Sequence, residues 1–137
     1  MPDVLLNPFR GGGISDLGPL PADDPRPVAE LLALCPAHAP TPLVELAGLA
    51  QRAGVARLCL KDERARMGLG SFKALGAAHA IARQAAAADG PWASALRGRT
   101  FVTASAGNHG LSVAAGARLF GARAQIFLAE TVPEGFA

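Results

Sequence analysis

A lysine near the middle of the chain lies in a setting suited to chemistry with a carbonyl compound. The residues from Gly70 to Ala77 read Gly-Ser-Phe-Lys-Ala-Leu-Gly-Ala. The Ser71 hydroxyl suits a helix N-cap, because it can accept a hydrogen bond from an unpaired amide of the first turn. Lys73 then lies in that turn, where the positive end of the helix dipole disfavours a charged amine. A Schiff base requires a neutral amine, although most lysines in such a turn are simply solvated charges.

A second pattern, residues 100–121, has the order of a strand, a tight turn and a helix. Phe101 and Val102 predict a short buried strand, residues 105–110 form a turn with two glycines, and residues 111–120 are rich in alanine and end at Gly121. A loop that follows a strand and opens a helix offers free amides and a favourable dipole to a carboxylate or phosphate. The alternative is an ordinary connection that merely uses glycine.

Together the two patterns closely resemble the fold-type II pyridoxal-phosphate enzymes, the family of tryptophan synthase β, the threonine and serine dehydratases and threonine synthase. Ser71-Phe72-Lys73 resembles the lysine motif of that family, and the run Ser-Ala-Gly-Asn-His-Gly at 105–110 resembles its loop for the substrate carboxylate. The order and spacing of several short motifs make a chance match improbable.

Further stretches narrow the resemblance to one subgroup, the diaminopropionate ammonia-lyases. Pro-Thr-Pro-Leu at 40–43 resembles the first family motif. Lys-Asp-Glu at 61–63, followed by Met-Gly-Leu at 67–69, resembles the run that precedes the lysine in this subgroup. The resemblance extends over residues 39–128, which is most of the chain.

The resemblance implies a role for each residue of the lysine motif and assigns one polar residue to the cofactor. Lys73 is expected to carry pyridoxal 5'-phosphate and to take the Cα proton of an amino-acid substrate. Phe72 is expected to lie against the cofactor ring, and its alternative role is that of a core aromatic. Asn108 is expected to hydrogen-bond the cofactor's 3′-oxygen; considered without the resemblance, a helix cap is the more common role for asparagine.

Three residues of the second motif are implied to hold the substrate carboxylate, partly through backbone amides: Ser105, Gly107 and His109. The alternative for His109 is a partly exposed position in the first turn of a helix. No pair of histidines has the spacing of metal ligands and no Cys-x-x-Cys occurs, so no metal site is expected.

The implied reaction is a β-elimination on an amino acid that releases ammonia and a 2-oxo acid. One position departs from the subgroup: an acidic residue precedes Gly-Asn-His-Gly there, whereas this chain has Ala106. Ser-Ala-Gly-Asn-His is instead typical of serine and threonine dehydratases. Three interpretations therefore stay open, namely an ammonia-lyase resembling the diaminopropionate subgroup, a serine or threonine dehydratase, and a catalytically inactive truncated remnant.

The expected fold class is α/β, a partial tryptophan synthase β-like fold with a parallel sheet and flanking helices. We expect an irregular N-terminal arm at 1–26. Residues 27–137 are expected to form an incomplete cofactor-binding α/β unit, made of the N-terminal part of the large domain and much of the small one. Helices are predicted at 27–34, 44–53 and 71–88, a strand at 55–60, one helical turn near Trp92, and a parallel β-α-β unit over 100–128.

The chain of 137 residues is short for this family. The glycine-rich loop for the cofactor phosphate and the residue that meets the pyridine nitrogen are expected beyond Ala137. We therefore expect an N-terminal fragment of an enzyme that is a homodimer at full length.

Composition restricts the other possibilities. Hydrophobic residues make up 50% of the chain and charged residues 18%, which excludes disorder for most of it. A net charge of +2 with scattered arginines makes nucleic acid an improbable partner. Cys35 and Cys59 are expected to be buried thiols. The absence of a long apolar run and of a signal peptide predicts a cytoplasmic protein without a membrane span, acting on a small amino acid.

Overall fold

The structure is a computed structural model that describes residues 8, 11–12, 18, 22–133 and 135. Most of the predicted irregular arm at 1–26 lies outside these residues. Four α-helices occur in the described part of the chain, α1 (Arg26–Ala33), α2 (Ala47–Ala53), α3 (Ala77–Ala86) and α4 (Asn108–Leu119), with three short 3-10 turns, η1 (Arg66–Gly68), η2 (Phe72–Leu75) and η3 (Trp92–Ser94). The strands there are β1 (Leu43–Glu45), β2 (Cys59–Lys61), β3 (Thr100–Ala104) and β4 (Arg123–Phe127).

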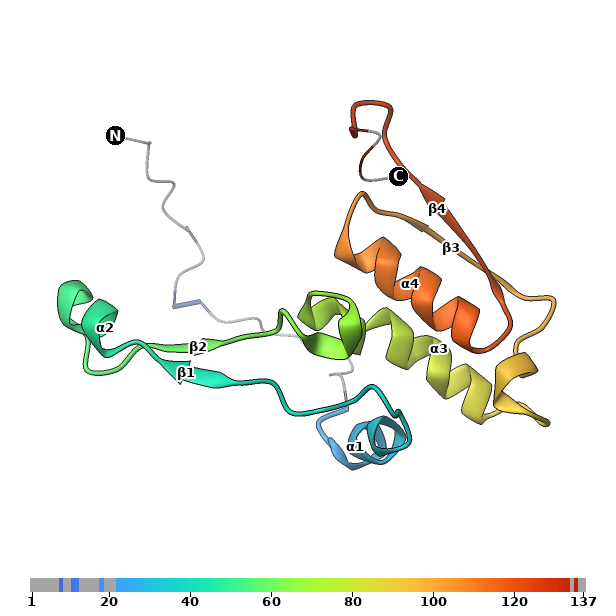
Figure 1. The fold of residues 1–137 in the computed structure, drawn as a ribbon, viewed down its shortest axis with the longest axis horizontal. Coiled ribbons are helices and arrows are strands. Elements are labelled where there is room, and N and C mark those ends of the chain that lie inside the picture. Colours follow the sequence, from blue (N-terminus) through green and yellow to red (C-terminus); the bar gives the residue numbers. More distant parts are fainter. Residues whose placement is uncertain (1–7, 9–10, 13–17, 19–21, 134, 136–137) are drawn as a thin grey trace.

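The strands form two separate pairs. β1 and β2 are antiparallel, with Leu43 opposite Lys61, and they form a narrow ribbon with α2 at its tip that extends away from the main group of helices (Figure 1). β3 and β4 are parallel, with Thr100 opposite Arg123, and α4 connects them across one face. The predicted β-α-β unit and the α/β fold class are confirmed.

The core lies between α3, α4 and the connection that contains η3. Ile81, Ala85, Leu96, Val113 and Phe120 are buried together, and the rings of Trp92 and Phe120 lie 5.7 Å apart. Small residues let the two helices approach closely: a Cβ at Gly116 would lie 3.0 Å from the Cα of Ala78. Figure 1 shows α3 and α4 side by side and running in the same direction. This packing determines how their N-terminal ends lie relative to each other.

The prediction of one long helix from Ser71 to Ala88 is wrong. The chain forms the 3-10 turn η2, leaves the helical conformation at Gly76 (φ −87°, ψ −84°), and begins α3 only at Ala77. Glycine lowers the cost of this interruption. Lys73 therefore lies in a single short turn, so the argument from the dipole of a long helix does not apply to it.

The prediction of a helix over 44–53 is also wrong at its start, and that of a strand over 55–60 is mostly wrong. Residues 43–45 are extended and pair with β2, α2 begins at Ala47, and β2 is confined to Cys59–Lys61. Pairing with a strand distant in the sequence outweighs local preference here. The predicted end of α2 at Gly54 is confirmed.

Other predicted elements are confirmed with small shifts. α1 begins one residue before the predicted Pro27, the turn at Trp92 is η3, and α4 begins at Asn108 and ends before Gly121. Gly121 has φ +75°, and a Cβ there would lie 2.6 Å from the Ala93 carbonyl oxygen, so both backbone and space require glycine.

Several burial predictions are wrong for this chain. Val102 is 61% exposed, because only the other face of the β3–β4 pair is covered by α4, and Cys59 is exposed on the ribbon. His79 is half-buried and lines an apolar cavity of about 490 Å³ between α1, α3 and α4. Within the described residues, no helix is long and apolar enough to cross a membrane.

Candidate active site

The turn η2 exposes its aromatic and basic side chains while a small residue anchors it. Ser71 is extended, and its Oγ accepts a hydrogen bond from the amide of Lys73 at 3.3 Å, so the predicted cap is confirmed. Ala74 is 1% exposed, whereas Phe72 is 63% exposed. The alternative of a core aromatic is therefore wrong for Phe72 in this chain, and the Phe72-Lys73 pair is accessible to a ligand.

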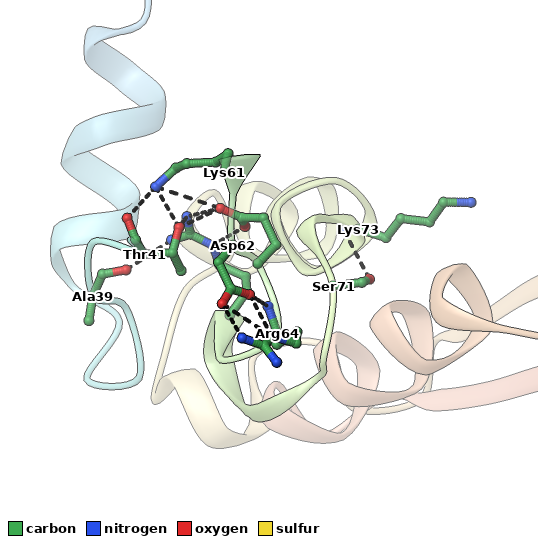
Figure 2. Close-up of polar contacts among 9 residues, drawn as sticks. Ala39, Thr41, Lys61, Asp62, Arg64, Ser71 and Lys73 are labelled. Atoms are coloured by element: carbon green, nitrogen blue, oxygen red, sulfur yellow. Dashed lines mark hydrogen bonds and ion pairs between the residues drawn. The ribbon is translucent and has the colours of Figure 1, made fainter. Parts of the chain in front are cut away.

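The two lysines of the chain differ sharply in their surroundings. The Lys61 ammonium donates to the carbonyl and to the hydroxyl of Thr41 and lies 3.8 Å from a carboxylate oxygen of Glu63. Within the part of the chain that the structure describes, no hydrogen bond or ion pair involves Nζ of Lys73. Figure 2 shows the Lys73 side chain extended away from the polar network that holds Lys61. Lys73 is thus the lysine whose amine is available.

The loop between β3 and α4 is folded around Ser105. Its Oγ accepts hydrogen bonds from the amides of Gly107 at 3.3 Å and Gly110 at 3.2 Å, and its own amide donates to the Phe127 carbonyl of β4 at 3.1 Å. A Cβ at Gly110 would lie 3.0 Å from the Ser105 carbonyl oxygen and 3.1 Å from the Ile126 side chain. The loop is therefore a tight turn at the carboxyl edge of the parallel pair, as predicted.

Amides at the start of α4 are left without acceptors. Among the described residues, no acceptor meets the backbone N–H groups of Ala106, Asn108 and His109. A Cβ at Gly107 would meet no atom within 4 Å, so the space above the loop is open. Unpaired amides at the N-terminus of a twelve-residue helix favour an anion.

The alternative role for Asn108 as a helix cap is wrong. Gly107 occupies the N-cap position, Asn108 is the first residue of α4, and the side chain that accepts a first-turn amide there is Ser105, through the amide of Gly110. Asn108 is exposed, and its amide group makes no hydrogen bond to any other described residue. His109 is half-buried in the first turn, which agrees with its alternative role.

A serine that sequence reasoning missed joins the two helices. The Ser112 hydroxyl, which is fully buried, accepts a hydrogen bond from the first-turn amide of Ala78 at 3.1 Å. α3 has no side-chain cap of its own, so Ser112 of α4 supplies the acceptor. This bond and the close packing at Gly116 keep η2 against α4, whose N-terminus carries the 105–110 loop. In the sequence, Ser112 could have been noticed only as a hydroxyl residue within a mostly apolar helix.

A second missed residue, Arg66, links the two motifs that precede the lysine. It is 6% exposed and bonds the Glu63 carboxylate, the Thr41 hydroxyl at 2.9 Å and the Ala39 carbonyl at 3.0 Å. Figure 2 labels Ala39 and Thr41, two partners of Arg66, together with Ser71 and Lys73. The Arg66 and Thr41 hydrogen bonds lower the pKa of Glu63 to about 2. In the sequence, Arg66 could have been noticed as a charged residue between the Lys-Asp-Glu and Met-Gly-Leu motifs.

Known proteins resemble the chain in sequence. The chain is 36% identical over 107 residues to diaminopropionate ammonia-lyase of Salmonella typhimurium. The aligned segment covers 68% of this chain and 26% of that relative. The Escherichia coli K12 enzyme of the same name is 36% identical over 101 residues, covering 66% of the chain and 25% of the relative. The chain thus spans about a quarter of the length of these relatives.

Solved structures resemble it as well. Holo diaminopropionate ammonia lyase from Escherichia coli matches with a TM-score of 0.69 and 32% identity, over 80% of this chain and 31% of that one. The same enzyme in complex with D-serine matches with a TM-score of 0.65 and 31% identity, over 79% and 31%. The family model described as "Pyridoxal-phosphate dependent enzyme" matches residues 34–137. With its accessible lysine and the unpaired amides at the start of α4, the chain belongs to the pyridoxal-phosphate-dependent enzymes.

Proposed function

We propose that this chain supplies the lysine and the substrate-carboxylate loop of an ammonia-lyase. The enzyme performs a pyridoxal-phosphate-dependent β-elimination on an amino acid and releases ammonia and a 2-oxo acid. The observation that carries the proposal is the contrast between the two lysines, since Lys61 is held by hydrogen bonds and Lys73 is unengaged. The relatives named diaminopropionate ammonia-lyase support this type of reaction.

The residues present fit pyridoxal phosphate and an amino acid. Lys73 offers an accessible amine, and Phe72 offers an exposed aromatic face on the same turn. The unpaired amides of Ala106, Asn108 and His109 offer donors to a carboxylate. In this proposal Phe72 lies against the cofactor ring, Asn108 donates its side-chain amide to the ring oxygen, and Ser105, Gly107 and His109 form the carboxylate site.

When bound, pyridoxal phosphate supplies an electron sink that makes the Cα proton of an amino acid acidic. The helix N-terminus orients the substrate by its carboxylate, so that Cα faces the lysine side. The Lys73 amine takes the Cα proton and holds it as an ammonium. Ser105 keeps the loop in shape by accepting the amides of Gly107 and Gly110.

A second candidate function, a serine or threonine dehydratase, is favoured by one specific observation. Ala106 lies at the loop between Ser105 and Gly107, where the diaminopropionate pattern has an acid, and alanine has no proton-transfer group. Both reactions are β-eliminations that leave the Lys73 role unchanged. They differ in the leaving group, which is an amine in one and a hydroxyl in the other.

The same proposal covers organisation and assembly. We propose that residues 27–137 form part of the large domain and much of the small domain of a homodimeric cytoplasmic enzyme whose substrate is a small amino acid. The match of residues 34–137 to the family model supports the position of this unit. Sedimentation of a full-length protein tests the dimer.

A chimera tests the function directly. Residues 34–137 replace the matching segment of the Escherichia coli enzyme, and the product is incubated with pyridoxal phosphate and reduced with borohydride. Peptide mapping is expected to find the reduced cofactor on Lys73, and 2-oxo acid release is expected from an L-amino acid. The variant Lys73→Arg should abolish the label, and the control Lys61→Arg should keep it. A label on another lysine, or none on a folded chimera, refutes the assignment.

A further inference from the structure

The turn that leads to Lys73 begins at a buried arginine with all its contacts inside the protein. The Arg66 guanidinium donates to both carboxylate oxygens of Glu63, at 2.6 and 2.9 Å, and also to the Thr41 hydroxyl and the Ala39 carbonyl. One side chain thereby ties residues 39–41 to residues 63–66, which are distant in the sequence. A planar fork with five donors suits this set of acceptors, and an ammonium does not.

The backbone immediately after Arg66 has an unusual conformation. Met67 has φ +50° and ψ +24°, in the left-handed region that non-glycine residues avoid, and Gly68 and Gly70 also have positive φ. A residue in that region persists where its surroundings hold it. The Leu69 amide donates to the Arg66 carbonyl at 2.9 Å, so the arginine holds the turn through its backbone as well as its side chain.

The neighbouring arginine gives a natural contrast. The Arg64 side chain is 88% exposed, and its partner among the described residues is Asp62, two residues away, at 2.6 Å. It therefore joins no distant segments, and solvent screens its ion pair. Removing Arg66 would instead leave the mostly buried Glu63 carboxylate with only Thr41 and the more distant Lys61 as partners among the described residues, and the Ala39 carbonyl without its donor. The two arginines differ in what they hold, although both lie in the same loop.

We propose that Arg66 is a positioning residue for Lys73. In this proposal Arg66 acts without contacting cofactor or substrate. It fixes the turn at 67–70, in which Met67, Gly68 and Gly70 have positive φ, so that the Ser71 cap presents the Lys73 amine in one orientation. The inference rests on the proposed function, in which Lys73 is the amine that takes the cofactor. It adds a residue whose effect passes through the backbone and not through contact with the reacting atoms.

Hydrogen exchange of the 137-residue chain, without cofactor, tests the proposal. The variant Arg66→Met is expected to speed amide exchange at residues 67–73 by about tenfold or more, because each lost charge-assisted bond normally opposes local opening. Amides of the α3–α4 core should keep their exchange rates. Arg66→Lys should also exchange fast, and the matched control Arg64→Met should stay near the original protein.

The borohydride experiment on the chimera then links the turn to the lysine. With Arg66→Met, labelling of Lys73 should be slower, and kcat for 2-oxo acid release should fall more than KM rises. Unchanged exchange at 67–73, or equal changes in the Arg64 and Arg66 variants, overturns the proposal. If Arg66→Met does not fold, Thr41→Val decides, since it removes one Arg66 acceptor at nearly constant volume; unchanged exchange in that variant also overturns it. If Lys73 of the unmutated chimera takes no label, the proposed function fails, whatever the exchange shows.

Discussion

At Ala106 this chain lacks the acidic residue that the diaminopropionate pattern has, so this residue bears on which enantiomer of the substrate can react. It is exposed in the loop between β3 and α4, beside the residues proposed to hold the substrate carboxylate. In the proposed function, Lys73 takes the Cα proton of an L-amino acid from its own side of the cofactor. A D-amino acid presents that proton to the opposite side, where alanine provides no base. The relative solved with D-serine makes the comparison direct.

We expect that the chimera eliminates only from L-amino acids, and that Ala106→Asp adds activity on D-serine or D-2,3-diaminopropionate. One general base within reach of the proton is worth on the order of 10²–10⁴-fold in rate. Release of 2-oxo acid from the two enantiomers measures the effect, and Ala106→Asn controls for size and polarity. Comparable rates on D and L substrates before any substitution would mean that another base exists.

At the scale of elements, contacts between segments distant in the sequence determine where the site residues lie. The Ser112 hydroxyl of α4 accepts an amide of α3, and the Arg66 network joins the chain before β1 to the turn after β2. Both contacts satisfy groups that the local segment leaves unpaired. They hold η2 beside α4, and hence the lysine motif near the 105–110 loop.

Ser112→Ala is expected to lower the free energy of unfolding by about 1–2 kcal/mol, because it leaves the Ala78 amide without an acceptor in a packed interface. Urea unfolding followed by circular dichroism measures the change. Ser94→Ala is the matched control, since the bond that the Ser94 hydroxyl makes within the described part of the chain is to the Pro91 carbonyl of its own turn. An equal effect of the two substitutions would show that Ser112 adds nothing as a cap.

The Glu63 carboxylate makes stability depend on pH in a defined window. The pKa of Glu63 is lowered from 4.5 to about 2 by hydrogen bonds from Arg66 and Thr41. The unfolded chain therefore binds a proton at a higher pH than the folded chain does. The stabilisation is fully present above pH 4.5 and is lost as the pH falls toward 2.

Glu63→Gln should accordingly flatten the dependence of unfolding free energy on pH between 4.5 and 2. Urea midpoints measured across this range test the expectation. Glu45→Gln provides a control, because the ion pair of Glu45 with Arg57 is exposed. A pH profile that Glu63→Gln leaves as steep as before would contradict the role given to the network.

At the scale of the whole molecule, apolar surface remains uncovered on both sheets. The outer face of the β3–β4 pair carries Val102 and Phe127, which are 61% and 54% exposed, and the ribbon exposes Leu43 and Leu60. Parallel sheets are normally covered on both faces. The chain spans about a quarter of its relatives' length, and large exposed apolar areas promote association.

The 137-residue chain on its own is therefore expected to self-associate as its concentration rises and to bind pyridoxal phosphate weakly. Sedimentation velocity over a wide concentration range measures the association. Replacing Val102 and Phe127 with Thr and Gln should shift the distribution toward monomer, whereas Arg118→Gln, on the exposed side of α4, should not. A monodisperse monomer that holds stoichiometric cofactor would contradict this expectation.

The sequence by itself determined the local motifs of this protein. Ser71 caps the turn of Lys73, the 105–110 residues form a tight loop before α4, and the β-α-β unit is parallel; each depends on residues adjacent in the chain. The roles of Phe72, Lys73, Ser105, Gly107, Asn108 and His109 remain predictions.

Only the tertiary structure decided which groups complete one another across the chain. Gly76 interrupts the predicted long helix where η2 and α3 both pack on α4, and Leu43–Glu45 is extended because β2 pairs with it. Arg66 and Ser112 gained their importance from partners far away in the sequence. Local patterns cannot specify such partners, since a buried guanidinium or hydroxyl is stabilised by whichever acceptor or donor the packing brings to it.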